Sequence, residues 1–294
     1  MNSTILGLLA ETSIHPGAGQ SAGFVDLPVA REAATDYPVI VGSSLKGALR
    51  DLARTRNNDD STADHLFGTP EHAGRVIVSD ARLVLLPVRS LSGSFRWITA
   101  PHLLTRLSRD FKRAGLSHGD DALASLPVLA AEKALAKTET IKGSNLFLEE
   151  RQFSVEADVP QTIIDLLRPL FAHKLTADTL ADRLIILNDD DFAWFARYGL
   201  AINARNQLDT VTKESKNLWY EETLPPDSLF YTLLATRGAH STTDEAMDQA
   251  LKLFKEIPYL QVGGNETVGQ GWFATSVVNS NALETALATE GAHQ

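Results

Sequence analysis

A strand-like apolar run passes into an amphipathic helix in the stretch Pro38-Val39-Ile40-Val41-Gly42-Ser43-Ser44-Leu45-Lys46-Gly47-Ala48-Leu49-Arg50. We expect Ser43 or Ser44 to cap this helix and the helix to run to about Thr55. Its leucines and alanines share one face, and beside them stands a row of three cations at helical spacing, Lys46, Arg50 and Arg54. Such a helix offers N-terminal amides and aligned charges to a phosphate chain, although an ordinary solvated helix has the same pattern.

A second glycine-rich stretch lies near the other end of the chain and reads Gly263-Gly264-Asn265-Glu266-Thr267-Val268-Gly269-Gln270-Gly271. Four of its nine residues lack a side chain, so the backbone can approach a ligand closely. It is not a P-loop, because no Gly-Lys-Ser/Thr follows, and its glycine spacing does not fit a dinucleotide-binding turn. A tight connection between two strands would account for the same residues, so this pattern alone is weak evidence for binding.

Titratable residues that precede prolines lie in a long Pro/Gly/Ser-rich loop near the N-terminus. His15 precedes Pro16, and Asp26 stands before Leu27 and Pro28, so both occupy restrained, non-helical backbone. An Asp can hold a divalent cation or orient a 2′-hydroxyl, and a His can move protons near neutral pH. A turn-capping Asp and a structural loop His are the commoner uses of these residues. The other histidines form no metal-binding spacing.

Composition restricts the class of protein. The 294 residues include 44% hydrophobic and 22% charged positions, which is typical of a globular chain. There is no Cys, which excludes disulfides and thiolate metal sites, and no targeting or membrane-spanning segment is apparent, so we expect a cytoplasmic protein with no membrane partner. A net charge of −10 argues against a free-standing, non-specific nucleic-acid binder, but not against a local basic stripe on an acidic body.

The order of strand and helix patterns predicts one α+β domain. Strand-like runs cover residues 4–12, 75–88, 95–99, 147–155, 184–187, 229–236 and 272–278, and helical patterns cover 102–137, 163–171, 179–184, 192–198 and 243–257. Two strands at 200–208 and 218–222 flank a polar tip at 209–217, which predicts a projecting hairpin. Glu221, near the end of that hairpin, could assist Asp26 if the strand returns to the same groove, or simply belong to an alternating strand edge.

These motifs together resemble the RAMP superfamily of CRISPR proteins, and within it the backbone subunits of type III-B (Cmr) RNA-targeting complexes. The resemblance extends in order over most of the chain, through the two glycine-rich stretches and through Phe67-Gly68, Asp80-Ala81-Arg82-Leu83, Leu86-Pro87-Val88-Arg89-Ser90-Leu91, Trp97-Ile98-Thr99 and Leu218-Trp219-Tyr220-Glu221-Glu222-Thr223-Leu224-Pro225-Pro226. It implies a ferredoxin-like (RRM-related) palm at about 1–101 and 228–294, a helical insertion at about 102–199 and a thumb hairpin at about 200–227.

The resemblance also implies an activity and partners. Backbone subunits of this kind stack along a guide RNA with copies of themselves and other Cmr-type subunits, and their thumbs splay the paired target RNA, which is cut with a divalent metal (Mg or Mn). An Asp before the family's Pro-x-x-Arg-Glu motif is critical, and here it is Asp26, which implies a metal and catalytic role. His15 takes an auxiliary role and Glu221 a weaker one. The implied RNA-binding residues are Ser43, Ser44, Lys46, Arg50, Arg205, Gly263, Gly264, Gly269 and Gly271.

The sequence therefore supports the hypothesis of an endoribonuclease subunit that binds guide RNA and cuts the paired target by 2′-hydroxyl attack. One alternative is a structural guide-binding subunit with no cutting activity, which the presence of Asp26 disfavours. A second is a metal-independent guide-processing nuclease that uses His15 as acid and base. That reading needs a further catalytic base, which the sequence does not indicate. The tip is less glycine-rich than the resemblance implies, so its shape stays open.

Overall fold

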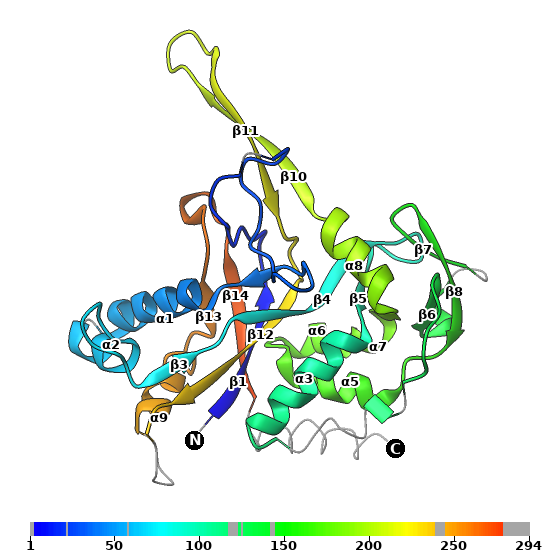
Figure 1. Cartoon of the computed structure of the whole chain (residues 1–294), viewed down its shortest axis with the longest axis horizontal. Helices are drawn as coiled ribbons and strands as arrows, with labels where there is room; N and C mark the ends of the chain where they lie inside the picture. Colours follow the sequence, from blue (N-terminus) through cyan, green and yellow to red (C-terminus); the bar gives the residue numbers. More distant parts are fainter. Residues whose placement is uncertain are drawn as a thin grey trace.

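A large mixed sheet with helices on both faces forms the body of the molecule, and a two-stranded ribbon projects from it (Figure 1). The computed structural model describes residues 3–21, 23–57, 59–116, 123–124, 126–141, 145–238 and 245–278. The helices are α1 (Gly42–Asn57), α2 (Asp60–Phe67), α3 (Pro101–Arg113), α5 (Gln161–Leu167), α6 (Lys174–Asp178), α7 (Leu180–Arg183), α8 (Asp189–Tyr198) and α9 (Glu245–Lys252), with short 3-10 turns η1 (Thr138–Thr140), η2 (Arg168–Leu170) and η3 (Glu266–Val268). No helix in this described part is long and apolar enough to span a bilayer.

The sheet runs in the order β13-β14-β1-β12-β4-β5-β9-β6-β8-β7, with β2 beside β4 and β3 beside β12. All pairs are antiparallel except β5 with β9 and β6 with β8. The predicted strands at 95–99, 184–187, 229–236 and 272–278 are confirmed, and each begins and ends at the predicted residue. The strands are β1 (Ser3–Ala10), β2 (Val39–Ile40), β3 (Val76–Val78), β4 (Ala81–Arg89), β5 (Phe95–Thr99), β6 (Lys133–Ala136), β7 (Asn145–Leu148), β8 (Arg151–Ala157), β9 (Leu184–Leu187), β12 (Leu229–Thr236), β13 (Tyr259–Gln261) and β14 (Trp272–Val278).

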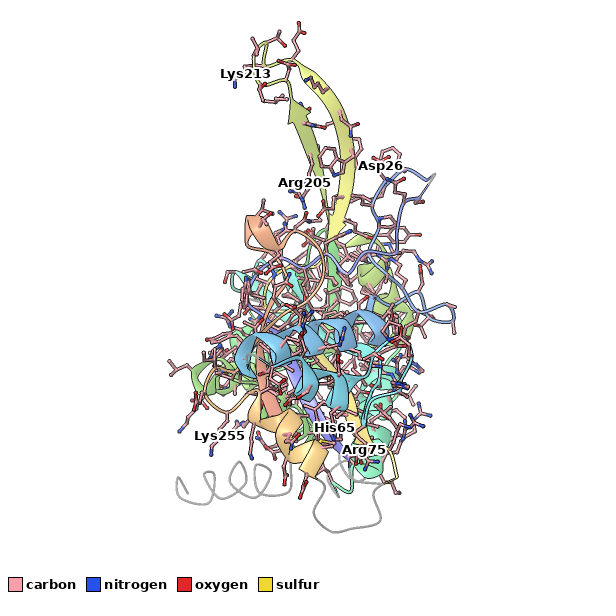
Figure 2. The ribbon with its side chains drawn as sticks, turned by 90° about the vertical axis from the view of Figure 1, so that its left-hand side faces the viewer. Asp26, His65, Arg75, Arg205, Lys213 and Lys255 are labelled. Carbon is pink, nitrogen blue, oxygen red and sulfur yellow. The ribbon has the colours of Figure 1, made fainter. Side chains whose placement is uncertain are left out.

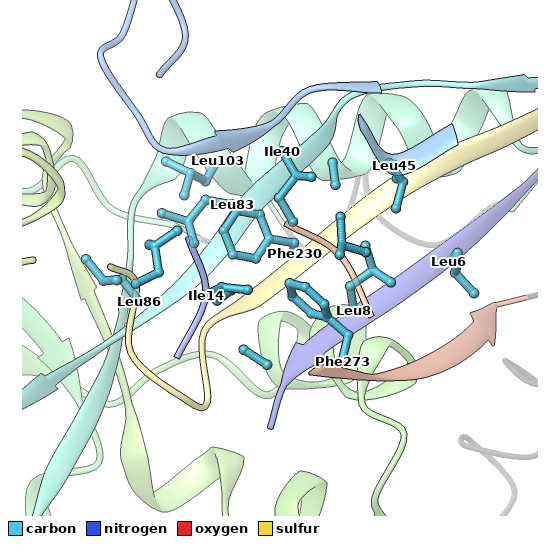
Figure 3. Packing of buried hydrophobic residues seen from close by; sticks show 14 of the residues in the cluster. Leu6, Leu8, Ile14, Ile40, Leu45, Leu83, Leu86, Leu103, Phe230 and Phe273 are labelled. Atoms are coloured by element: carbon cyan, nitrogen blue, oxygen red, sulfur yellow. The ribbon is translucent and has the colours of Figure 1, made fainter. Parts of the chain in front are cut away.

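Strand β1 is buried on both faces because its alternate side chains enter two different cores. Leu6 and Leu8 pack with residues of α1, α2 and α9, and Figure 3 shows this cluster around Phe230 and Phe273. Ile5 and Leu9 pack with α3 and α5 on the other face. At Gly7 an added Cβ would lie 2.2 Å from the carbonyl oxygen of Leu170, so only glycine allows η2 to approach the strand. This double burial explains why the strand reads as an unbroken apolar run.

Four antiparallel strands form the half of the sheet that carries the predicted palm, in the order β14-β1-β12-β4. Helix α1 lies between β1 and β4 in sequence, and α9 lies between β12 and β14. Both helices contribute to the same core cluster, so they cover the same face of these strands. The N-terminal loop between β1 and β2 leaves this layer at the top and returns to it before α1 (Figure 1).

The segment at 102–199 contains strands as well as helices. The predicted helix at 102–137 is confirmed over α3 and is wrong at Lys133–Ala136, which form β6 between β9 and β8; residues 117–122 and 125 lie outside the described part. Lys-Ala-Leu-Ala favours helix by intrinsic propensity, but backbone pairing with two strands overrides that preference. The helix predicted at 243–257 is shorter, since α9 ends at Lys252, and its first two residues lie outside the described part.

The projecting ribbon consists of β10 (Ala201–Leu208) and β11 (Ser215–Thr223), which form a separate two-stranded sheet; β11 also makes an isolated bridge from Glu221 to Leu27. It confirms the predicted hairpin, although β11 begins earlier than predicted, so the tip is shortened to 209–214. Asp209 shapes the tip by accepting hydrogen bonds from the amides of Val211 and Thr212, at 2.7 and 2.9 Å. Lys213 takes the left-handed conformation with φ 60°, so the turn closes without glycine.

Candidate nucleic-acid interface and cleavage site

Asp26 lies on the N-terminal loop where that loop runs beside the base of the thumb (Figure 2). Its Oδ2 accepts a hydrogen bond of 2.8 Å from the backbone N–H of Tyr220 on β11. The next residue continues the contact: the Leu27 N–H donates to Tyr220 O at 3.1 Å, and the Glu222 N–H donates to Leu27 O at 3.0 Å. The carboxylate is therefore fixed to the thumb base by side-chain and main-chain bonds, which the sequence did not predict.

Asp26 lines an open hollow of about 400 Å³. Its lining comes from both the loop and the thumb: Gln20, Ser21, Asp26, Leu27, Gln207, Asn217, Leu218 and Trp219. Asp26 Oδ1 accepts no hydrogen bond from the residues that the structure describes. Asp26 is the only acidic side chain in that lining, and within the described residues no three His, Cys, Asp or Glu side chains gather into a metal-binding group.

His15 is buried between the thumb base and the glycine-rich stretch. Its Nδ1 lies 2.8 Å from Glu222 O; because a carbonyl only accepts, Nδ1 carries the proton and Nε2 is left without one in the neutral ring. On the other side, the Gly264 N–H donates to His15 O at 3.2 Å. A Cβ at Gly263 would lie 2.8 Å from the same carbonyl oxygen, so that glycine is required by close approach. His15 thus connects two of the predicted binding segments.

Glu221 is 2% exposed and its two carboxylate oxygens are already engaged. Oε2 accepts a 2.8 Å hydrogen bond from Arg205 on β10, and Oε1 accepts one from the side-chain amide of Asn265. Asn265 adopts the left-handed conformation, with φ 65°. This residue is part of the predicted glycine-rich stretch, but no role was assigned to it from sequence. Glu221 therefore links the thumb to that stretch, and its geometry suits positioning better than proton transfer.

Arg31 and Glu222 form a second connection at the thumb base. Arg31 Nη2 donates to Glu222 Oε1 at 2.7 Å, and its Nη1 donates to two backbone carbonyl oxygens, of Asp36 and Ala196. The other oxygen of Glu222 accepts from the Val29 N–H at 3.0 Å. Both side chains are mostly buried, which strengthens a charged hydrogen bond relative to one in water. They hold the chain just after Asp26 against β11.

The N-terminus of α1 is capped differently from the prediction. The helix begins at Gly42, and the carboxylate of Asp80 accepts from the Gly42 N–H at 2.7 Å, so neither Ser43 nor Ser44 is the cap. Asp80 lies between β3 and β4 and is distant in sequence, which is why a local capping rule missed it. Both serines lie in the first turn with exposed side chains. Their hydroxyl groups are thereby left available at the surface.

The three predicted cations of α1 differ in their surroundings. Arg50 forms an ion pair with Asp64 of α2, and Arg54 pairs with Asp60 at 2.6 Å. The pairing raises the pKa of Arg50 above its usual value, chiefly through the hydrogen bond to Asp64. Within the described structure no acid pairs with Lys46. The row predicted from helical spacing therefore has one free cation at its start and two neutralised ones behind it.

Helix α1 and the glycine-rich stretch line a common groove of about 690 Å³. We call it the α1–glycine groove; its lining includes Gly17, Ser44, Gly47, Gly263, Gly264 and Trp272. Gly269 and Gly271 have φ values of 81° and 85°, which a residue with a side chain rarely adopts. The two stretches are more than two hundred residues apart, yet they meet at one surface. Of the residues for which an RNA-binding role was predicted, Ser44, Gly263 and Gly264 line this groove, and its charged lining residues are Asp51, Arg56 and Glu266.

This arrangement of a large sheet, a glycine-rich stretch and a projecting hairpin has known counterparts. The chain belongs to the RAMP superfamily, whose family model matches residues 8–274. Among individual proteins, it is 34% identical to the CRISPR system Cmr endoribonuclease Cmr4 of Pyrococcus furiosus, over 92% of this chain and 94% of that one. It is 24% identical to the CMR subunit Cmr4 of Saccharolobus solfataricus, over 89% and 92% of the two chains.

Solved structures agree with this assignment. The crystal structure of oligomeric Cmr4 from Pyrococcus furiosus superposes with a TM-score of 0.75 at 29% identity, covering 95% of this chain and 100% of that one. A type III-B Cmr-beta complex bound to cognate target RNA contains a chain that superposes equally well, with a TM-score of 0.75 over 97% and 99% of the two chains. At 19% identity, that second likeness concerns the fold.

Proposed function

We propose that this chain is the repeating backbone subunit of a type III-B CRISPR effector, which binds guide RNA and cuts the paired target RNA. The 34% identity to a Cmr endoribonuclease, over nearly the full length of both chains, supports the activity. The observation that carries the assignment to a site is the fixed position of Asp26 between a hollow and the thumb base. Self-association is supported by the oligomeric crystal structure of the Pyrococcus relative. We expect the complex to work in the cytoplasm.

The guide RNA is proposed to follow the α1–glycine groove. Ser44, Gly263 and Gly264 line the groove, where a hydroxyl group and bare backbone can meet the phosphate chain. Ser43 and Lys46 are sequence neighbours of Ser44 and Gly47 in the first turns of α1, and Lys46 is proposed to add a positive charge at the edge of the groove. Arg50 contributes less than its place on the helix suggests, because Asp64 already neutralises it. Arg205, on β10, is likewise paired with an acid, Glu221 on β11, so its proposed contribution to RNA binding is also reduced. An acidic protein can gain affinity for a long guide by repeating the same few contacts from one subunit to the next.

The proposed reaction is internal transesterification of the target strand. The ribose 2′-oxygen bonds to the adjacent phosphorus as its proton leaves, and the bond from phosphorus to the 5′-oxygen of the next nucleotide breaks. That oxygen takes up a proton, so the products are a 2′,3′-cyclic phosphate and a 5′-hydroxyl. In-line attack requires a backbone geometry that a paired A-form strand does not offer, so the target must be splayed beside Asp26. The adjoining thumb is suited to do this.

A divalent metal ion is part of this proposal. The described residues offer it a single carboxylate oxygen, Asp26 Oδ1, which fits the way Mg²⁺ is often held by one carboxylate together with phosphate oxygens. When bound, such an ion would offset charge that develops at the scissile phosphate. His15 Nε2 is proposed as an auxiliary proton carrier. Glu221, whose oxygens are both engaged, enters the proposal as a positioning residue for Arg205 and Asn265.

The palm is proposed to be ferredoxin-like. The strand order β14-β1-β12-β4, with α1 and α9 as crossovers on one face, supports this. The division into palm at about 1–101 and 228–294, insertion at about 102–199 and thumb at about 200–227 is likewise proposed. The insertion is mixed in structure, since it contributes four strands to the sheet.

The test uses complexes assembled on a guide, with a matching end-labelled target RNA, in the presence and absence of a chelator. Asp26→Ala should lower the single-turnover cutting rate by about 10²-fold or more while target affinity is unchanged. Asp26→Asn keeps an acceptor for the Tyr220 N–H and should be nearly as inactive, which separates charge from positioning. The matched control, Glu71→Ala, removes an exposed carboxylate from the turn after α2 and should cut normally.

Three results would contradict the proposal. Equal loss of binding and cutting in both Asp26 variants would make the residue structural. Full cutting in the presence of the chelator would show that the reaction does not need a divalent metal ion. A wild-type complex that binds the target but leaves it intact would favour the alternative, a structural guide-binding subunit.

A further inference from the structure

An exposed aromatic side chain stands two residues before Asp26. Phe24 is 88% exposed, whereas the phenylalanines Phe67, Phe111, Phe153 and Phe230 are among the most deeply buried side chains of the chain. It sits in the short turn 23–26, closed by a 2.9 Å hydrogen bond from Ser21 N–H to Asp26 O. Nothing in folding alone explains an aromatic ring here, because burial is what stabilises such a ring in water.

A second aromatic ring backs Phe24. The rings of Phe24 and Tyr220 are stacked, with centroids 6.3 Å apart and planes 20° from parallel. Tyr220 is itself 39% exposed, and its backbone N–H is the group that holds Asp26 Oδ2. The same residue thus fixes the carboxylate with its backbone and supports the exposed ring with its side chain. The position of Phe24 is therefore coupled to the position of Asp26.

The surroundings of this pair suit a nucleobase. Phe24 and Tyr220 are sequence neighbours of lining residues of the hollow at Asp26. That lining combines the polar side chains of Gln20, Ser21, Gln207 and Asn217 with Leu27, Leu218 and Trp219, and Asp26 is its only acid. An unpaired base gains affinity by stacking on an exposed aromatic face, and it does so whatever its identity. A nucleotide splayed out of a guide–target duplex has lost its stacking neighbours and needs such a replacement.

We propose that Phe24, backed by Tyr220, is a stacking platform for the base of a target nucleotide that flanks the cut. This inference rests on the proposed function, since it assigns a subsite to the same cleavage site. Stacking holds the splayed nucleotide while the adjacent phosphate faces Asp26. Because stacking is indifferent to base identity, the platform lets the complex cut any sequence that the guide selects.

The first test compares Phe24→Ala, Phe24→Leu and Phe24→Trp in assembled complexes. Phe24→Ala should lower the single-turnover cutting rate about tenfold, the scale of one lost base stack. Phe24→Trp should cut at the wild-type rate, and Phe24→Leu should resemble Phe24→Ala, because only a planar ring stacks. The matched control, Leu175→Ala, removes another exposed apolar side chain, on α6, and should change nothing. Wild-type cutting by Phe24→Leu, or loss of filament copies in Phe24→Ala, would overturn the proposal in favour of apolar packing between subunits.

A second test does not depend on cutting. Target RNAs with 5-iodouridine at single positions are bound to Asp26→Ala complexes, irradiated and analysed by mass spectrometry, because this base crosslinks to aromatic rings on which it stacks. Crosslinks to Phe24 or Tyr220 at nucleotides beside the mapped cut sites are expected, and they should be lost in Phe24→Ala. Crosslinks only elsewhere would overturn the platform even if the complex cuts. If the wild-type complex does not cut the target but crosslinks still form at Phe24, the stacking platform is upheld and the proposed nuclease activity is contradicted.

Discussion

The palm and the thumb use the same kind of strand for opposite purposes. In β1 every residue from Thr4 to Ala10 is buried, whereas in β10 no residue is. Strand β11 changes character along its length: it is exposed from Ser215 to Leu218 and buried from Glu221 to Thr223. We therefore expect the buried strands of the predicted palm to supply most of the stability of the fold, and the exposed part of the predicted thumb to contribute little. The two regions meet at the buried end of β11, where Asp26 is held.

The largest expected difference between the two regions is in folding stability. Phe230→Ala empties a fully buried position in β12 and should lower the free energy of unfolding by about 3–5 kcal/mol. Val211→Ala truncates a side chain that is 87% exposed at the thumb tip, and it should change the free energy of unfolding by less than about 0.5 kcal/mol. Denaturant unfolding of the two isolated variants measures both values. Similar losses in both would mean that the thumb is part of the cooperative core.

A smaller effect is expected where the two regions meet. Glu221→Gln removes the buried charge that pairs with the partly exposed Arg205 and should lower the unfolding free energy by about 1–3 kcal/mol, because a charge-assisted hydrogen bond to a buried group is replaced by a weaker one. The matched control is Glu214→Gln, an exposed tip residue that should alter stability by less than about 0.5 kcal/mol. The cutting rate of Glu221→Gln should also fall, while the dependence of that rate on metal concentration should match that of the wild type. Unchanged stability together with lost cutting would instead make Glu221 a catalytic group.

The smallest expected effect concerns RNA binding on the palm itself. Lys46→Ala should reduce the slope of log affinity for guide RNA against log salt by about one unit per subunit bound. Arg50→Ala should reduce it by less, because Asp64 already neutralises that guanidinium group. Guide-binding isotherms at several salt concentrations measure both slopes. Equal reductions would show that the Arg50–Asp64 pair opens when RNA binds, and no reduction in either would remove α1 from the RNA path.

Local patterns predicted the elements whose side chains follow one period. The ends of β5, β12 and β14 were predictable because each is an apolar run bounded by polar or turn residues, and α1 was predictable from its apolar face. Strand β6 was not, because its Lys-Ala-Leu-Ala sequence favours helix and only pairing with β8 and β9 makes it a strand. Tertiary contacts of this kind leave no trace in a short window of sequence.

The candidate site divides in the same way. The types of residue needed for RNA chemistry were visible at Asp26, His15 and Lys46, and the glycine-rich stretch indicated close approach of the backbone. Their partners were not visible: Tyr220 holds Asp26, Asp64 neutralises Arg50, and Asn265 engages Glu221. Phe24 stands out in the sequence as an aromatic residue among small residues of the loop. Only the structure shows that its side chain is exposed and can therefore stack with a ligand.

The central claim is that the thumb determines where the target is cut, because it splays the paired strand next to Asp26. The most direct measurement replaces the thumb segment at 209–217 with a short Gly/Ser turn and maps the target products of an assembled complex at nucleotide resolution. The account predicts that cutting fails or that the products lose their regular spacing, while guide binding persists through the α1–glycine groove. An unaltered ladder of products at the same positions would contradict it.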